Sequence, residues 1–125
     1  MPYPPEPTRV LVVDDRAEMA EMIADDLNDR GYEATAVTSG EEALHILRTQ
    51  RVDVLVTDLR MPGVDGFDVV RVSVELDPSR TIILMTAYGT LDTALEATGR
   101  GVFQYMIKPF RLDALARVLE QAHRV

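Results

Sequence analysis

One basic side chain of this sequence differs in type from all the others. The chain contains 13 lysine and arginine residues, and Lys108 is the only lysine among them. A lysine ammonium is a compact point charge, whereas an arginine guanidinium is a planar fork. Lys108 follows the apolar run 102–107 and precedes Pro109. This position favours contact with a single oxyanion at the end of a buried strand, although chance retention of one lysine would look the same.

Three carboxylates offer chemistry that a lone ammonium would complement. Asp14 and Asp15 follow the apolar run 9–13, and Asp58 follows the strand-like segment 52–57. Carboxylates gathered in one cleft raise one another's proton affinity, so they need a cation. Mg²⁺ binds carboxylates together with phosphate and water, and Mn²⁺ accepts the same oxygen ligands. A carboxylate is also a nucleophile that can form an aspartyl phosphate.

These residues match the needs of phosphoryl transfer, which depends on positioning and on neutralised oxygens. Asp58 would attack the phosphoryl group. Asp14 and Asp15 would hold the metal ion beside it, Asp15 directly and Asp14 partly through water. Asp58 itself and the main-chain carbonyl of Arg60 would be further ligands.

Thr86 and Lys108 would bind the phosphoryl oxygens, the threonine through its hydroxyl and the lysine through its charge. Each candidate also has an ordinary structural explanation. An Asp-Asp pair often begins a helix, Asp58 precedes a turn-like sequence, Thr86 is a suitable helix cap, and Lys108 would fit a structural ion pair. Candidates at the ends of four different strands favour a shared site over four separate explanations.

The elements that must position these side chains alternate between strand and helix. Strands are predicted at residues 9–13, 33–37, 52–57, 81–85 and 102–107. Helices are predicted at 17–30, from a capping box at 39–42, at 66–76, at 91–99, and from Leu112 onward. The central strands are continuously apolar, as in parallel sheets covered on both faces. The pattern predicts an α/β fold with a doubly wound, five-stranded parallel sheet.

The order of the strands decides whether the candidates meet. In open α/β sheets, ligands bind outside the carboxyl ends of the strands, where the strand order reverses. With the flavodoxin-like order 2-1-3-4-5, that point lies between the first and third strands, which carry the acidic pair and Asp58. We therefore expect residues far apart in the sequence to converge on one end of the sheet.

Composition and charge exclude several classes of function. The 125 residues fit one domain, and the four prolines of Met1–Pro7 predict a disordered tail before a domain at 8–125. Cysteine is absent, so there is no disulfide framework. The net charge of −8 argues against direct nucleic-acid binding. No membrane span or signal pattern is present, so a cytoplasmic location is expected.

Four segments carry a resemblance to a known family. They are 11–15 (Leu-Val-Val-Asp-Asp), 58–66 (Asp-Leu-Arg-Met-Pro-Gly-Val-Asp-Gly), 85–89 (Met-Thr-Ala-Tyr-Gly) and 105–110 (Tyr-Met-Ile-Lys-Pro-Phe). The chain resembles the receiver domain of bacterial two-component response regulators over about residues 8–124. The third and fourth segments are most similar to receivers of enhancer-dependent transcription activators of the nitrogen-regulation type.

The resemblance implies a phosphoacceptor rather than an enzyme that acts on other molecules. Asp58 would accept a phosphoryl group from a sensor histidine kinase or a small phosphodonor, with Mg²⁺ held by the acidic pair. The chain would catalyse only its own phosphorylation and dephosphorylation. Thr86 and Tyr105 would be the switch residues, and Lys108 would contact the phosphate. A cis peptide bond would precede Pro109.

An output surface is expected on the last third of the chain. The helix at 91–99 has a thin apolar face, formed by Leu91, Ala94, Leu95 and Ala97 and interrupted by threonines. We expect this helix to be loosely held. Together with the strand 102–107 and the last helix, it would form the output face and mediate homodimerisation. An ordinary surface helix is the alternative.

Three other functions remain as alternatives. A phosphatase of the haloacid-dehalogenase type also uses an aspartate nucleophile, but it needs an acid where Arg60 stands. A flavin-binding domain of the same topology needs a phosphate loop rich in glycine and hydroxyl groups, whereas this chain has Asp14-Asp15-Arg16 there. A degenerate receiver is disfavoured because every core position is filled.

Overall fold

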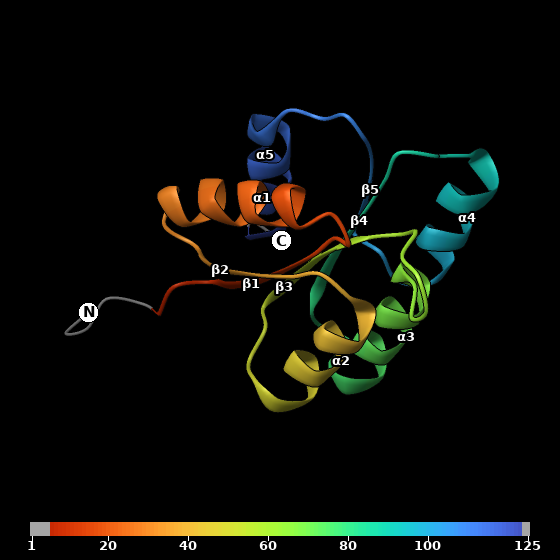
Figure 1. The fold of residues 1–125 in the computed structure, drawn as a ribbon, viewed down its shortest axis with the longest axis horizontal. Helices are drawn as coiled ribbons and strands as arrows, with labels where there is room; N and C mark the ends of the chain where they lie inside the picture. Colours follow the sequence, from red (N-terminus) through yellow and green to blue (C-terminus); the bar gives the residue numbers. More distant parts are fainter. Residues whose placement is uncertain (1–5, 124–125) are drawn as a thin grey trace.

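Strands and helices alternate along the part of the chain that the computed structural model describes, residues 6–123 (Figure 1). In this range the strands are β1 (Arg9–Val13), β2 (Glu33–Val37), β3 (Val54–Asp58), β4 (Thr81–Thr86) and β5 (Gln104–Ile107). The helices are α1 (Ala17–Asp29), α2 (Gly40–Thr49), α3 (Gly66–Leu76), α4 (Leu91–Gly99) and α5 (Leu112–His123). Within the same residues, no helix combines the length and apolarity that a bilayer crossing requires.

Most of the N-terminal tail expected at 1–7 lies outside the described residues. Its last two residues are described, and both contact Arg51. The Arg51 guanidinium lies 3.2 Å from the Glu6 carboxylate and donates a hydrogen bond of 3.4 Å to the Pro7 carbonyl. Residues 6 and 7 are therefore attached to the loop that leads into β3.

The strands form one parallel sheet in the order β2-β1-β3-β4-β5. This confirms the fold class and the strand order predicted from the sequence. The order reverses between β1 and β3, whose pairing ends with Val13 opposite Thr57. Asp14 and Asp58 come next on these two strands, so they lie beside each other at the carboxyl end of the sheet.

Helices cover both faces of the sheet, which explains why the central strands are continuously apolar. Val12 and Val56 pack against α1 and α5 on one face. Leu11 and Leu55, one residue earlier on each strand, pack against α2 and α3 on the other face. In Figure 1, α1 and α5 lie above the sheet, and α2 and α3 lie below it.

Two strands begin two residues later than the sequence predicts. Val52 is buried in the core but precedes the first paired residue of β3, Val54. Val102 lies in the connection after α4, where its N–H donates back to the Ala97 carbonyl after a turn at Gly101, whose φ is +88°. An apolar residue next to a strand is thus not always part of it.

Side-chain caps determine where the helices start. Ser39 accepts a hydrogen bond of 3.1 Å from the Glu42 N–H, as predicted for α2. The Glu42 carboxylate, however, accepts from the hydroxyls of Thr38 and Ser39, so the predicted capping box is only half formed. Complete capping boxes begin α3 at residues 65–68 and α4 at residues 90–93.

Helix α4 makes few apolar contacts with the rest of the domain. Ala97 is the one buried residue of this helix, whereas Leu91 and Leu95 are 74% and 62% exposed. Both leucines of the thin apolar face thus point away from the core, and Ala97 makes the buried contact. The guanidinium of Arg100 lies 4.8 Å from the centre of the Phe67 ring and attaches the end of α4 to α3.

Candidate functional site

The carboxyl ends of four strands bring the candidate residues together. Asp14 follows β1, Asp58 ends β3, Thr86 ends β4, and Lys108 follows β5. Asp14, Asp58 and Thr86 are buried, and the side chain of Lys108 is 10% exposed. Asp15 is exposed at the mouth of the site. The convergence expected from a parallel sheet of this order is present.

The Lys108 ammonium bridges two of the carboxylates. Its Nζ lies 2.6 Å from Asp14 Oδ2 and 3.6 Å from Asp58 Oδ2. The Lys108 N–H donates to the Thr86 carbonyl at 2.8 Å, which attaches this residue to the end of β4. The peptide bond between Lys108 and Pro109 is cis. The nearer partner of the lone lysine is Asp14.

Asp14 is held through both of its carboxylate oxygens. Oδ1 accepts a hydrogen bond of 2.9 Å from the Arg16 N–H, and Oδ2 pairs with Lys108. The Asp14 N–H donates to the Val37 carbonyl at 3.2 Å. A fully buried carboxylate needs such partners, because the loss of hydration is costly otherwise.

Asp14, Asp15 and Asp58 form an acidic cluster that fits a divalent cation. Each offers one carboxylate oxygen, and these three oxygens all lie within 4.8 Å of one another. Three carboxylates are the oxygen donors that a hard cation prefers.

Burial raises the pKa of Asp58 above its ordinary value. The surrounding groups act in both directions: the Lys108 ammonium lowers this pKa, whereas Asp14 and Asp15 raise it. The net direction is upward because one ammonium does not offset burial and two neighbouring carboxylates. A bound divalent cation would favour the ionised carboxylate.

Thr86 places a hydroxyl at the same end of the sheet. Its side chain is fully buried, and Oγ1 accepts a hydrogen bond of 3.1 Å from the Tyr88 N–H. A hydroxyl that accepts one hydrogen bond still has its own proton to donate. Thr86 is therefore able to act as a donor toward an oxyanion in the site.

Tyr105 is connected to the start of α4 by a hydrogen bond that the sequence analysis missed. The Tyr105 hydroxyl lies 2.6 Å from Thr93 Oγ1. Thr93 also forms the capping box of α4 with Thr90. In the sequence alone, Thr93 only interrupts the apolar face of the helix at 91–99. Its spacing of three residues from Thr90 was the available signal for a cap, but the pairing with Tyr105 depends on tertiary packing.

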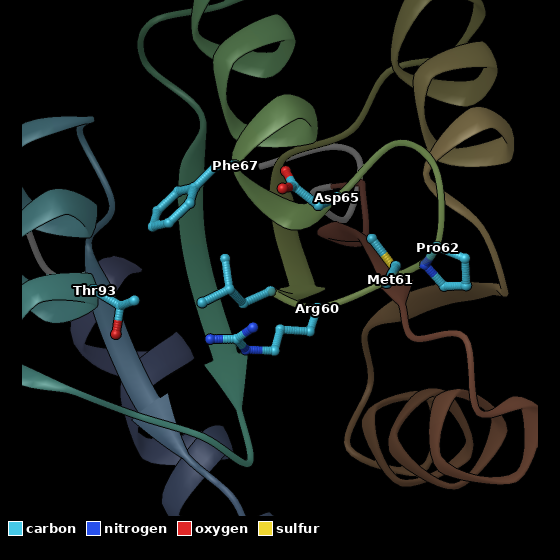
Figure 2. A pocket seen from close by; sticks show the side chains of 7 residues that line it. Arg60, Met61, Pro62, Asp65, Phe67 and Thr93 are labelled. Atoms are coloured by element: carbon cyan, nitrogen blue, oxygen red, sulfur yellow. The ribbon is translucent and has the colours of Figure 1, made fainter.

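A cavity of about 500 Å³ lies between the loop after β3 and helix α4 (Figure 2). Figure 2 shows the Arg60 side chain extending from this loop toward α4, where Thr93 lies. The Arg60 side chain thus points along the cavity, and metal binding by its main-chain carbonyl stays a prediction. The lining residues are Leu59, Arg60, Met61, Pro62, Asp65, Phe67 and Thr93.

Comparison with proteins of known sequence identifies the family of this chain. Residues 10–120 match the family model described as response regulator receiver domain. The chain is 36% identical over 114 residues to the regulatory protein AtoC of Escherichia coli (strain K12), covering 91% of this chain and 25% of that protein. It is 35% identical over 111 residues to the DNA-binding transcriptional regulator NtrC of Klebsiella pneumoniae, covering 89% and 24%. The chain thus spans about a quarter of the length of these relatives.

Solved structures agree as well. A response regulator receiver domain protein from Clostridium thermocellum superposes with a TM-score of 0.86 at 31% identity, covering 92% of this chain and 93% of that chain. The chemotaxis protein CheY4 of Vibrio cholerae superposes with a TM-score of 0.88 at 28% identity, covering 94% and 99%. The family resemblance expected from the sequence is confirmed, and the chain belongs to the response regulator receiver domains of two-component systems.

Proposed function

We propose that this chain accepts a phosphoryl group on Asp58, with Mg²⁺ held by the acidic cluster and the main-chain carbonyl of Arg60. The observation that carries the proposal is the position of Lys108, whose ammonium lies 2.6 Å from Asp14 and 3.6 Å from Asp58 beside that cluster. Positive charge next to a nucleophilic carboxylate is what phosphoryl transfer requires. Receiver domains interact with histidine kinases, and we expect the donor to be a sensor kinase or a small phosphodonor.

Each residue of the site has a separate role in phosphoryl transfer. A carboxylate oxygen of Asp58 attacks phosphorus, a new P–O bond forms, and the bond to the donor breaks on the opposite side. The leaving group departs with the bonding electron pair. Mg²⁺ held by Asp14, Asp15 and Asp58 would supply positive charge next to the transferred oxygens. Lys108 turns from Asp58 toward one phosphoryl oxygen, and Thr86 donates its hydroxyl proton to another.

The same contacts suggest how the phosphoryl group is sensed. A pull on Thr86 toward the phosphoryl oxygen withdraws its hydroxyl from the Tyr88 N–H. Tyr105 then moves toward the space behind Thr86, which requires its hydrogen bond to Thr93 to break. Because Thr93 also caps α4, the movement loosens the first turn of that helix. A local phosphorylation would thus change the α4 surface.

Acetyl phosphate with Mg²⁺ is expected to add one phosphoryl group to the wild-type protein. Intact-mass spectrometry measures the product, and removal of Mg²⁺ by EDTA is expected to suppress labelling, because one ammonium cannot neutralise a phosphoryl group among three carboxylates. Re-addition of Mg²⁺ to the same sample is the control. A protein that gains no mass with Mg²⁺, or labels equally in EDTA, contradicts the proposal.

We also propose that phosphorylation drives homodimerisation through α4, β5 and α5. The apolar side chains Leu91, Leu95 and Ile107 are 74%, 62% and 55% exposed on this part of the domain. Exposed apolar side chains on neighbouring elements are typical of protein–protein contact sites. A bistable Tyr105 beside α4 gives phosphorylation a means of changing this surface.

Dimer formation is expected to increase when beryllofluoride, a mimic of the phosphoryl group, is added with Mg²⁺. Size-exclusion chromatography with light scattering measures the mass. Leu95→Glu is expected to abolish the increase, because it places a charge in the apolar surface. Leu76→Glu is the matched control, since Leu76 is 48% exposed on α3, away from this surface. An unchanged mass of the wild type would count against the proposal, as would dimerisation of the Leu95→Glu variant.

A further inference from the structure

A buried hydroxyl stands in β3 directly before Asp58. The strand reads Val-Leu-Val-Thr-Asp, and the Thr57 side chain is fully buried among apolar neighbours. Thr57 Oγ1 donates a hydrogen bond of 3.0 Å to the main-chain carbonyl of Asp58. A valine of the same shape would fill this space without a polar atom, so packing alone does not account for a threonine.

The Asp58 carbonyl lies where the pairing between β3 and β1 has ended. The last pair of these strands is Thr57 with Val13. On the other side, the ladder continues past the site, because the Leu59 N–H donates to the Met85 carbonyl at 2.8 Å. On the β4 side, Asp58 is thus fixed by main-chain hydrogen bonds. On the β1 side, where the pairing of the strands has ended, the Thr57 hydroxyl holds the Asp58 carbonyl.

The first turn of α3 packs closely against the Asp58 carbonyl. The Gly66 N–H donates to the Leu59 carbonyl at 2.8 Å, which brings the first turn of α3 onto the end of β3. A Cβ atom at Gly66 would lie 2.3 Å from the Asp58 carbonyl oxygen and 2.7 Å from Leu59 Cα, both backbone atoms. The carbonyl therefore has the Thr57 hydroxyl as a donor and the first turn of α3 close beside it, and the two together hold its orientation.

We infer that Thr57 is a positioning residue for Asp58: its hydroxyl anchors the Asp58 carbonyl and thereby aims the carboxylate at Lys108 and the acidic cluster. The inference rests on the proposed function of Asp58. A carbonyl that loses its donor inside the protein rotates to find another one, because an unsatisfied buried acceptor is costly. Rotation of that peptide redirects the Asp58 side chain, whose Oδ2 lies 3.6 Å from Lys108 Nζ. Misplacement by about 1 Å is enough to slow a positioned reaction strongly.

The test compares phosphorylation rates with acetyl phosphate and saturating Mg²⁺ at a temperature where all proteins are folded. Thr57→Val keeps the shape but removes the donor, and a rate about tenfold lower than wild type is expected. Thr57→Ser restores the donor and is expected to recover most of the rate. Ser73→Ala is the control, because Ser73 is an equally buried hydroxyl that accepts a hydrogen bond from Arg80 at the far end of α3. It should lose stability without losing rate.

Each outcome separates this inference from the proposed function. If the wild type is phosphorylated and Thr57→Val reacts at the same rate, Thr57 is only a core residue and the inference is overturned. If the wild type takes no phosphoryl group, the proposed function fails by itself. Crystal structures of wild type and Thr57→Val then test directly whether the Asp58 carboxylate has moved. An Asp58 carboxylate that keeps its place relative to Lys108 in the variant overturns the inference, and a displaced one supports it.

Discussion

Asp58→Asn is expected to abolish phosphorylation completely and, at the same time, to raise the thermal stability of the metal-free protein. The first effect follows because an amide is not a nucleophile for phosphorus under these conditions. The second follows because Asp58 is buried beside two other carboxylates with one ammonium between them. Removing one charge relieves this repulsion while the side chain keeps its shape. An increase in melting temperature of a few degrees is expected.

The stability effect should depend on pH in a defined direction. Burial raises the pKa of Asp58 above its ordinary value of 3.8, so the folded state holds this proton more tightly than the unfolded state. The stabilisation that the protonated group provides is complete below pH 3.8 and is lost as the pH rises through the folded-state pKa. The melting temperatures of wild type and Asp58→Asn should therefore converge in acid and separate toward neutral pH, in buffer without divalent cations.

Asp53→Asn is the matched control for this pair of measurements. Asp53 accepts a hydrogen bond of 2.8 Å from the Arg9 N–H and lies 3.4 Å from Arg51, at the start of β3 rather than its end. Its replacement should lower the melting temperature and leave labelling by acetyl phosphate intact. Residual labelling of Asp58→Asn at the wild-type level would show that another residue is the acceptor. A lower melting temperature of that variant at neutral pH would show that Asp58 is stabilising as a charge.

The sequence was sufficient to predict which residues meet, because the meeting depends on topology. Short apolar strands that alternate with helices allow few arrangements, and a parallel sheet aligns all carboxyl ends at one side. Asp14, Asp58, Thr86 and Lys108 therefore converge wherever their strands are correctly ordered. The bounds predicted for α3 and α4, 66–76 and 91–99, are those of the structure, and both helices begin at side-chain caps.

The sequence was not sufficient where the outcome depends on which neighbour covers a surface. Leu91 and Leu95 have the spacing of a buried helical face, yet both are exposed and Ala97 makes the buried contact. Periodicity gives the angle between side chains but not the direction of the core. The contact between Thr93 and Tyr105 joins residues on two elements, so no local pattern contains it. The nearer partner of Lys108, Asp14 rather than Asp58, is likewise a result of packing.

Lys108→Met is expected to lower the free energy of unfolding of the metal-free protein by about 3–5 kcal/mol, the usual cost of removing one partner from a buried ion pair. Asp14 is fully buried, and the ammonium 2.6 Å from its Oδ2 is the cation closest to it among the described residues. Without Lys108, the Arg16 N–H is the one hydrogen-bond donor left to the Asp14 carboxylate among residues 6–123. Urea unfolding followed by circular dichroism measures the loss.

Two companion variants separate charge from geometry in this prediction. Asp14→Asn combined with Lys108→Met removes both charges, so the double variant should be more stable than Lys108→Met alone.

Lys108→Arg keeps the charge, so this variant should fold. A planar guanidinium cannot replace a point charge between two carboxylates and a phosphoryl oxygen, so phosphorylation-dependent dimerisation should be lost. Mg²⁺ should stabilise Lys108→Met more than it stabilises the wild type, because the ion then replaces the positive charge of the lost ammonium. Equal stability of Lys108→Met and wild type in EDTA would mean that the Asp14 carboxylate is hydrated, and the lysine would then act on the phosphoryl group alone.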